Sequence, residues 1–295
     1  MRNEKLRSVD GKELTIYVWD EVESPKAVLQ LSHGMCENLG RYDDFARFMN
    51  KHGYIVIGDD HRGYGLTDDG KGWSEGEFVG STVIDLLILN GQIKQKYPDL
   101  PVVFLGHSYG SILGQRFVEF NTGIKACVLT GTLALPYGVG LLGQALMWLP
   151  KLVLGKVRMA MPEANKGFED TDVPGAWLTK DKEIRKAYVA DPLAGGKASI
   201  AFMYGMIKLL AKGARPRSLK KIDKDLPIAI YCGSEDPVGM KGKLPPKLAE
   251  RYKKLGIKTV DLKLYQNDRH EVLNETDRDV VYNDVLAFFD KALEK

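Results

Sequence analysis

The sequence predicts an α/β protein with a mostly parallel sheet. Several apolar runs of four or five residues, rich in β-branched side chains, show no polar alternation, which is typical of strands buried on both faces. Segments with helical spacing lie between these runs, and strand alternating with helix indicates a parallel sheet with right-handed crossovers. At 295 residues the chain is long enough for one large domain or two ordinary ones.

Each predicted element follows from a local pattern. Residues 5–9 and 13–19 flank Asp10-Gly11, a dipeptide that favours a hairpin turn, so the sheet is expected to begin with two antiparallel strands. Apolar runs predict six further strands, at residues 27–31, 54–57, 102–105, 126–129, 228–232 and 259–265. Helical spacing predicts helices at residues 42–52, 78–97 and 109–120, and from 277 to the end.

The alternation stops between residues 133 and 219. No buried strand is predicted in this segment, and helical spacing recurs at residues 141–154, 183–189 and 200–211. Because the strand pattern resumes at residue 228, the later strands complete the same sheet. We therefore predict one α/β core, residues 1–132 and 220–295, with a helical cap, residues 133–219, inserted after the sixth strand of an eight-stranded sheet flanked by helices.

Composition excludes several classes of protein. The chain is 44% hydrophobic and 27% charged, as in ordinary globular domains, and its net charge of +3 gives no basic footprint for nucleic acid. The N-terminus lacks the apolar segment of a signal peptide. The most apolar window, residues 138–154, is expected to fall short of a membrane span because it holds Gln144, Pro150 and Lys151. We expect a soluble, cytoplasmic protein, since three widely spaced cysteines favour a reducing compartment: Cys36, Cys127 and Cys232.

One motif places a candidate nucleophile. Residues 106–110 read G-H-S-Y-G, directly after a predicted strand and at the start of a predicted helix, which is the context that a nucleophilic serine turn needs. Ser108 is therefore the candidate nucleophile. A second G-x-S-x-G, at residues 72–76, lies in a polar loop and is rejected. Residues 138–143 match G-x-G-x-x-G, but no strand directly precedes them, so we reject a dinucleotide site.

A serine needs a general base, and the base needs an acid that orients it. His270 is the only histidine after Ser108, and it follows the last predicted strand. After the strand at residues 228–232 stand two acids, of which we prefer Asp236 to Glu235 as the partner of His270. The backbone N–H groups of Met35 and Tyr109 are the expected oxyanion donors, and His33 is expected to brace the loop before Met35.

These motifs, taken together, resemble the α/β-hydrolases of the monoacylglycerol lipase and lysophospholipase group, also called serine aminopeptidase S33-like hydrolases. The matching pieces span most of the chain: residues 33–37, 41–42, 60–67, 106–110, 233–238 and 269–271, with 176–179 and 191–193 in the cap. The resemblance implies Ser108, Asp236 and His270 as the catalytic triad and a cap over an acyl pocket. The chain departs from the family at two positions, where Asn38 replaces a histidine and Tyr109 replaces a methionine. We expect Tyr109 to narrow or polarise the pocket floor, and Cys36 to be a packed residue.

The predicted cap is rich in large apolar side chains. Most of such a stripe is expected to be core. Part of it should face the substrate, and methionines and aromatics suit a flexible acyl chain because they fill irregular space. The candidate substrate contacts are Met147, Trp148, Met203 and Met206. An apolar segment that carries lysine also fits transient contact with a lipid surface.

The leading hypothesis is a serine hydrolase that cleaves esters of apolar acyl chains, such as monoacylglycerols, lysophospholipids or small aryl and alkyl esters. Thioesterases, aminopeptidases or amidases, and C–C bond hydrolases use the same triad and stay open as alternatives. Dehalogenases and epoxide hydrolases are excluded because they need a carboxylate at position 108. An alternative of another class is a receptor of this fold without turnover. The chemistry requires no cofactor and no metal, and the sequence leaves the oligomeric state open.

Overall fold

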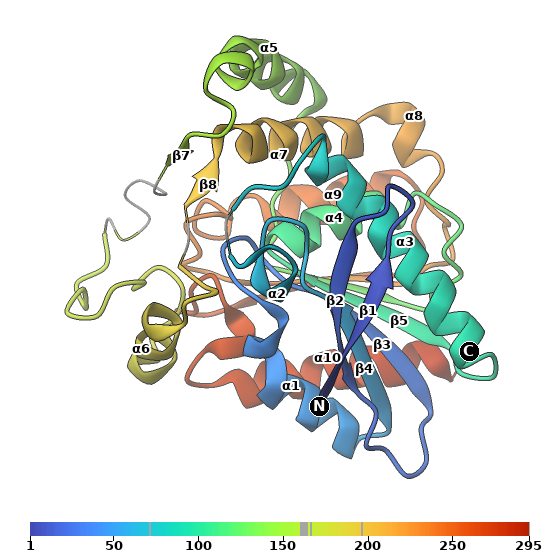
Figure 1. The fold of residues 1–295 in the computed structure, drawn as a ribbon. Helices are drawn as coiled ribbons and strands as arrows, with labels where there is room; N and C mark the ends of the chain where they lie inside the picture. Colours follow the sequence, from blue (N-terminus) through green and yellow to red (C-terminus); the bar gives the residue numbers. More distant parts are fainter. Residues whose placement is uncertain (71, 160–164, 166, 196, 295) are drawn as a thin grey trace.

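The computed structural model describes residues 1–295 except residues 71, 160–164, 166, 196 and 295. Its described part contains an eight-stranded sheet in the order β1-β2-β4-β3-β5-β6-β9-β10, and Figure 1 shows this sheet between layers of helices. The strands are β1 (Arg2–Arg7), β2 (Glu13–Trp19), β3 (Ala27–Ser32), β4 (Tyr54–Asp59), β5 (Val102–His107), β6 (Cys127–Thr130), β9 (Ile228–Gly233) and β10 (Val260–Tyr265). The predicted fold class is confirmed.

The pairing of the strands follows the predicted pattern. β1 and β2 form the antiparallel hairpin around Gly11, and β2 also pairs antiparallel with β4. The other pairs, from β4 through β10, are parallel. Because parallel strands run the same way, the loops after β3, β5, β9 and β10 all emerge at one edge of the sheet, where the candidate site residues lie.

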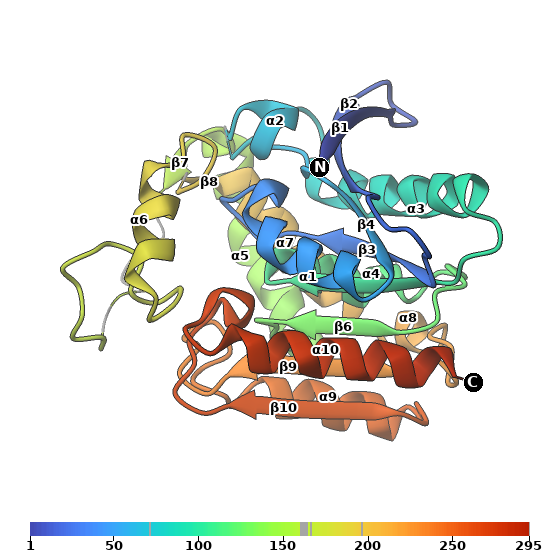
Figure 2. The same ribbon diagram turned by 90° about the horizontal axis from the view of Figure 1, so that it is seen from below.

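Helices cover both faces of the sheet and enclose two apolar cores. One face packs against α1 (Asp43–Lys51) and α10 (Arg278–Leu293), which lie in front of the strands in Figure 2. The other face packs against α3 (Phe78–Lys96), α4 (Tyr109–Phe117) and α9 (Pro245–Lys254). Short helices complete the connections: η1 (Leu39–Tyr42), α2 (Gly65–Asp68) and η2 (Val272–Asn274).

The segment between β6 and β9 is mostly helical. It contains α5 (Tyr137–Leu154), α6 (Lys182–Ala190), α7 (Ile200–Gly213) and α8 (Pro216–Leu219). The expectation of no buried strand here is wrong in one detail, since β7 (Arg158–Met159) pairs with a buried β8 (Ala198–Ser199). A two-residue ladder is too short to leave a periodic signal. The division into core and cap at residues 133 and 219 stays a prediction.

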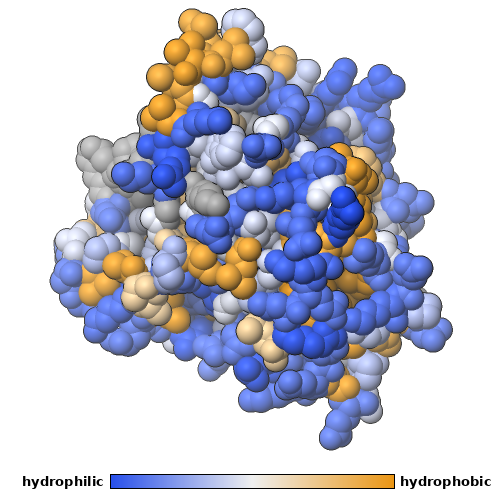
Figure 3. Space-filling model, in the orientation of Figure 1, coloured by the Kyte–Doolittle hydropathy of each residue, from blue (hydrophilic) through white to orange (hydrophobic). Residues whose placement is uncertain are grey.

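Helix α5 lies on the outside of α7 (Figure 1). The glycine motif at residues 138–143 allows the two helices to pack closely. A Cβ on Gly140 would stand 2.6 Å from the Cβ of Ala211, so a side chain at this position would force the helices apart. The expectation that the apolar stripe is mostly core is wrong for α5. Many of its large apolar side chains are exposed: Val139, Leu141, Leu142, Leu146, Trp148, Leu149, Leu152, Val153 and Leu154. An orange, apolar surface lies over this helix at the top of Figure 3.

The same helix bears on the membrane expectation. Pro150 lies inside α5 and does not end it. By length and composition alone α5 could cross a membrane, and only 6% of it is buried. Gln144, Pro150 and Lys151 therefore lie within one continuous helix and do not shorten it.

Candidate active site

Ser108 lies on the turn between β5 and α4, where the backbone is strained. Its φ of +51° is in a region that residues with a side chain rarely occupy. Two glycines make the turn sterically feasible: a Cβ on Gly106 would stand 2.4 Å from the carbonyl oxygen of Gly110, and one on Gly110 would stand 2.1 Å from that of Ser32. The motif therefore uses glycine where the chain leaves no room for a side chain.

The structure brings His270 and Asp236 to this serine. Ser108 Oγ lies 2.8 Å from His270 Nε2, and His270 Nδ1 lies 3.0 Å from Asp236 Oδ1. Asp236 follows β9 and His270 follows β10, so two adjacent strands position the candidate acid and the candidate base. Glu235 points elsewhere, since its half-exposed carboxylate pairs with Lys241 at 3.1 Å.

The hydrogen bonds assign the proton of the imidazole ring. A carboxylate only accepts, so His270 Nδ1 donates to Asp236, and Nε2 is left to accept from the Ser108 hydroxyl. Burial, the largest single cause, lowers the pKa of His270, but the carboxylates of Asp236, Glu271 and Glu37 together outweigh it and the pKa is raised. The ring is therefore a stronger base than a free histidine, and it is aimed at the serine.

Asp236 is held by one of its two oxygens. Oδ1 accepts both the His270 bond and a 2.8 Å bond from the backbone N–H of Val238. Oδ2 is buried and has no hydrogen-bond partner among the described residues. The Val238 amide thus fixes which oxygen faces the histidine.

The amides of Met35 and Tyr109 are free to bind a ligand. Within the described residues, neither N–H donates a hydrogen bond, and both residues line the cavity that opens at Ser108. Tyr109 is the first residue of α4, where backbone N–H groups lack helical partners. Its side chain is buried, with the ring 4.9 Å from that of Phe202 in an edge-to-face contact.

The cavity at Ser108 has a volume of about 200 Å³ and is mostly apolar. Two of the four predicted cap contacts, Met203 and Met206, line it. Met147 and Trp148 do not, because α5 lies beyond α7, and Trp148 is 56% exposed. Other lining residues were not predicted: Ile112, Leu133, Trp177, Leu178, Tyr188, Ile207, Leu210 and Val238. Spacing within a helix gives its apolar face but not which of two stacked helices is the inner one.

A buried ion network joins the loop after β3 to the loop of the base. Arg41 donates to both oxygens of Glu271 at 2.8 and 2.7 Å, and it also contacts Glu37. Glu37 accepts in turn from the backbone N–H of Gly34. Burial opposes ionisation of Glu271, but the Arg41 guanidinium lowers the pKa of that carboxyl to about 2. The network therefore holds Gly34 and the residue after His270 in one rigid unit.

The loop before α6 is bonded to the histidine loop. The backbone N–H of His270 donates to Trp177 O at 3.3 Å, and that of Glu271 donates to Leu178 O at 2.7 Å. The Trp177 ring lies over the imidazole, with the ring centres 5.1 Å apart. Asn38, at the position where the family carries histidine, donates to Asp191 at 2.7 Å and ties the loop after β3 to the segment after α6.

Three carboxylates lie close together beside the histidine loop: Asp268, Glu275 and Asp277. The Lys180 ammonium lies 2.7, 3.9 and 4.0 Å from their oxygens. A cation of the chain itself therefore already occupies the position that a metal ion would take among these carboxylates, and we assign the cluster no metal.

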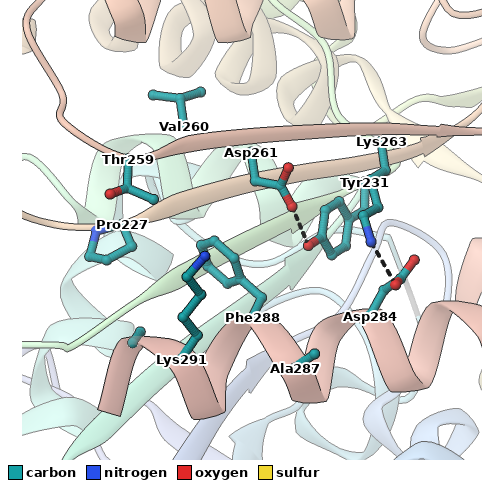
Figure 4. A pocket seen from close by; sticks show the side chains of 11 residues that line it. Pro227, Tyr231, Thr259, Val260, Asp261, Lys263, Asp284, Ala287, Phe288 and Lys291 are labelled. Atoms are coloured by element: carbon teal, nitrogen blue, oxygen red, sulfur yellow. Dashed lines mark hydrogen bonds and ion pairs between the residues drawn. The ribbon is translucent and has the colours of Figure 1, made fainter. Parts of the chain in front are cut away.

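A larger cavity, of about 370 Å³, lies between β10 and α10 (Figure 4). The hydroxyl of Tyr231 donates a hydrogen bond to Asp261 Oδ2 at 2.6 Å, and the ammonium of Lys263 forms an ion pair with Asp284 at 2.6 Å. Among the described residues no serine, cysteine or histidine lines it. The volume of a cavity therefore does not identify the site, and the smaller cavity at Ser108 is the one that holds the candidate nucleophile and base.

A mostly parallel sheet with a serine on the strained turn between a central strand and a helix defines the α/β-hydrolase class. Within that class, residues 23–277 match the serine aminopeptidase S33 family, and the chain belongs to it. It is a monoacylglycerol lipase-like member of the family, as the sequence motifs predict.

Individual relatives agree with this assignment. The chain is 28% identical to a monoacylglycerol lipase of Mycolicibacterium smegmatis over 95% of this chain and 94% of the relative. It is 29% identical to the monoglyceride lipase of Rattus norvegicus over 78% of this chain and 72% of the relative. A solved lipase in an open form superposes with a TM-score of 0.86 at 27% identity, covering 100% of this chain and 99% of that one. These likenesses support a carboxylic ester hydrolase of the lipase and esterase type.

Proposed function

We propose that the protein is a serine hydrolase that cleaves carboxylic esters of apolar acyl groups through Ser108, His270 and Asp236. One observation carries the proposal. The hydrogen-bonded chain from Asp236 through His270 to the Ser108 hydroxyl ends in an apolar cavity of about 200 Å³. A reactive hydroxyl at the wall of an apolar pocket suits an acyl group with a reactive carbonyl.

The proposed reaction has two halves. His270 Nε2 takes the proton of Ser108 as Oγ attacks the ester carbonyl, and the N–H groups of Met35 and Tyr109 bind the oxygen that becomes negative. The imidazolium, stabilised by Asp236, then protonates the departing alcohol and leaves an acyl-serine. In the second half a water attacks this acyl-serine with His270 again as base, which releases the acid and restores the hydroxyl of Ser108.

The cavity favours short acyl chains. At about 200 Å³ it is smaller than the roughly 300–1,000 Å³ that drug-sized ligands occupy. Each methylene that becomes buried gains about 0.8 kcal/mol, or roughly fourfold in kcat/KM, until the cavity is full. Monoacylglycerols, lysophospholipids and small aryl or alkyl esters with short acyl groups are the proposed substrates. Met203 and Met206 would contact the acyl chain.

The exposed face of α5 fits transient contact with a lipid surface. Lys151 and Lys156 lie on and just after the helix, so positive charge accompanies the exposed leucines. Contact with a bilayer interface gains from the apolar area that it buries and from attraction between lysines and anionic lipids. The three cysteines are free and buried, which fits a reducing compartment, and we propose a cytoplasmic location.

A series of p-nitrophenyl esters from acetate to palmitate tests the proposal. We expect hydrolysis that rises with chain length to an optimum at about six carbons and then falls. The Ser108→Ala variant should fold and lose the activity. Tight ligand binding without hydrolysis of any ester would favour a receptor instead. Faster turnover of matched thioesters or amides would favour the thioesterase or amidase alternatives.

A further inference from the structure

A buried histidine holds the loop that carries Met35. His33 follows β3 and is fully buried, with Nδ1 2.7 Å from the carbonyl oxygen of Gly34. The backbone N–H of His61 donates to His33 Nε2 at 2.9 Å. Because Nε2 accepts from a backbone amide, the proton of the neutral ring must sit on Nδ1, which therefore donates to Gly34 O.

This bond sets the direction of a neighbouring amide. The carbonyl of Gly34 and the N–H of Met35 belong to one planar peptide unit, and the described residues contain no cis peptide bond. In a trans peptide the two groups point to opposite sides, so fixing one fixes the other. The N–H of Gly34 is fixed too, by Glu37. Both peptide units around Gly34 are therefore held, and the Met35 amide is left without a partner among the described residues.

A second histidine, His61, packs against His33 and is itself held by hydrogen bonds. His61 stacks on His33 with the ring centres 4.1 Å apart. Asp59 Oδ2 lies 2.9 Å from His61 Nδ1, and Ser32 Oγ lies 2.9 Å from His61 Nε2. Ser32, His61 and Asp59 thus repeat the geometry of a Ser-His-Asp triad. All three are fully buried and line none of the described cavities, so this second triad has no access to substrate and serves as a brace.

We propose that His33 is a positioning residue that aims the Met35 N–H at the developing oxyanion, through its hydrogen bond to the Gly34 carbonyl. The inference rests on the proposed function, because the Met35 amide matters only if an oxyanion forms at Ser108. A donor aimed in advance needs no reorganisation during the reaction, and the loss of one such donor costs about 100- to 1,000-fold in kcat. The free ester carries no full charge, so its binding should depend little on this amide.

The test compares three substitutions. His33→Asn places an amide N–H close to the position of Nδ1, whereas the longer side chain of His33→Gln places it near Nε2 and His33→Leu removes it. We expect His33→Asn to keep kcat within about fivefold of wild type, and the other two to lose about 100-fold in kcat with KM nearly unchanged. Thermal unfolding shows which variants fold. If His33→Leu does not fold, the comparison of His33→Asn with His33→Gln decides the outcome.

A surface histidine provides the matched control. His52 Nδ1 also lies 2.8 Å from a backbone carbonyl oxygen, that of Phe48, but His52 is exposed at the C-terminal end of α1 and does not line the cavity at Ser108. His52→Leu should leave kcat unchanged. The inference is overturned if folded His33→Gln keeps kcat within threefold of wild type, or if His33→Asn loses as much as His33→Gln. Activity that persists in Ser108→Ala would instead overturn the proposed function, and the inference with it.

Discussion

Substitution of Asp236 by asparagine removes charge while leaving the hydrogen bonds intact. Both bonds to this side chain use Oδ1, from His270 Nδ1 at 3.0 Å and from the Val238 amide at 2.8 Å. If asparagine turned its NH₂ group toward the histidine, that group would also face the Val238 N–H, donor against donor. The oxygen should therefore keep the Oδ1 position, and the NH₂ group should take the place of Oδ2, which has no partner in the described structure.

The expected loss follows from this geometry. With the oxygen in place, His270 keeps its proton on Nδ1 and still accepts from Ser108. The variant then loses only the difference between a charged and a neutral hydrogen bond, about 1–2 kcal/mol, or roughly 5- to 30-fold in kcat. Inversion of the histidine tautomer would cost about 10,000-fold.

The pH dependence of kcat/KM gives a second, independent test of the Asp236→Asn variant. The neutral imidazole is the active base, so activity falls as the pH drops below the pKa of His270, which the carboxylate raises. Without that charge, burial remains and lowers the pKa, so the acidic limb of kcat/KM should move to lower pH in Asp236→Asn. Steady-state hydrolysis of p-nitrophenyl butyrate between pH 5 and 9 measures both effects. A loss near 10,000-fold, or an acidic limb that moves to higher pH, would refute the reasoning.

Two further predictions concern the pocket and the histidine loop. Tyr109→Met should move the optimum of the ester series to chains longer by about one or two carbons, since methionine is smaller and adaptable, while the backbone donor remains. An unchanged optimum would show that the ring does not limit the cavity. Lys180→Met should cost about 3 kcal/mol of stability because it leaves the buried carboxylate of Asp268 without its ion-pair partner. Burial raises the pKa of Asp268 to about 6, so protonation should make the loss smaller at pH 5 than at pH 8, measured by thermal unfolding. An equal loss at both values would contradict it.

The core of the site was predictable because its residues follow strands. Each of Ser108, Asp236 and His270 stands just after an apolar run, and parallel strands deliver their carboxyl ends to one edge of the sheet. Order along the chain therefore carries spatial information. The same reasoning gave the loop of Met35, which follows β3.

The contacts of the cap were not predictable in the same way. Met147 and Met206 both lie on apolar helices, and periodicity treats them alike. Only packing places α7 against the pocket and α5 outside it, through the contact of Gly140 with Ala211. Trp177 lies in a loop without a periodic pattern, and its position above His270 depends on backbone bonds between distant segments.

The second triad shows that residue types alone do not identify a catalytic site. Ser32, Asp59 and His61 match the first triad in residue type and in bond length, yet they line none of the described cavities. Residue types alone do not separate a brace from a catalytic centre. A strained turn and an adjoining cavity do, and of the two serines only Ser108 has both.

Covalent labelling tests the central claim most directly. A fluorophosphonate reacts only with a serine that a neighbouring base activates. The wild-type protein should gain one adduct, and mass spectrometry of its peptides should place that adduct on Ser108, with none on Ser32 and none in the Ser108→Ala variant. Equal labelling of the two proteins, or an adduct on another residue, would contradict the account.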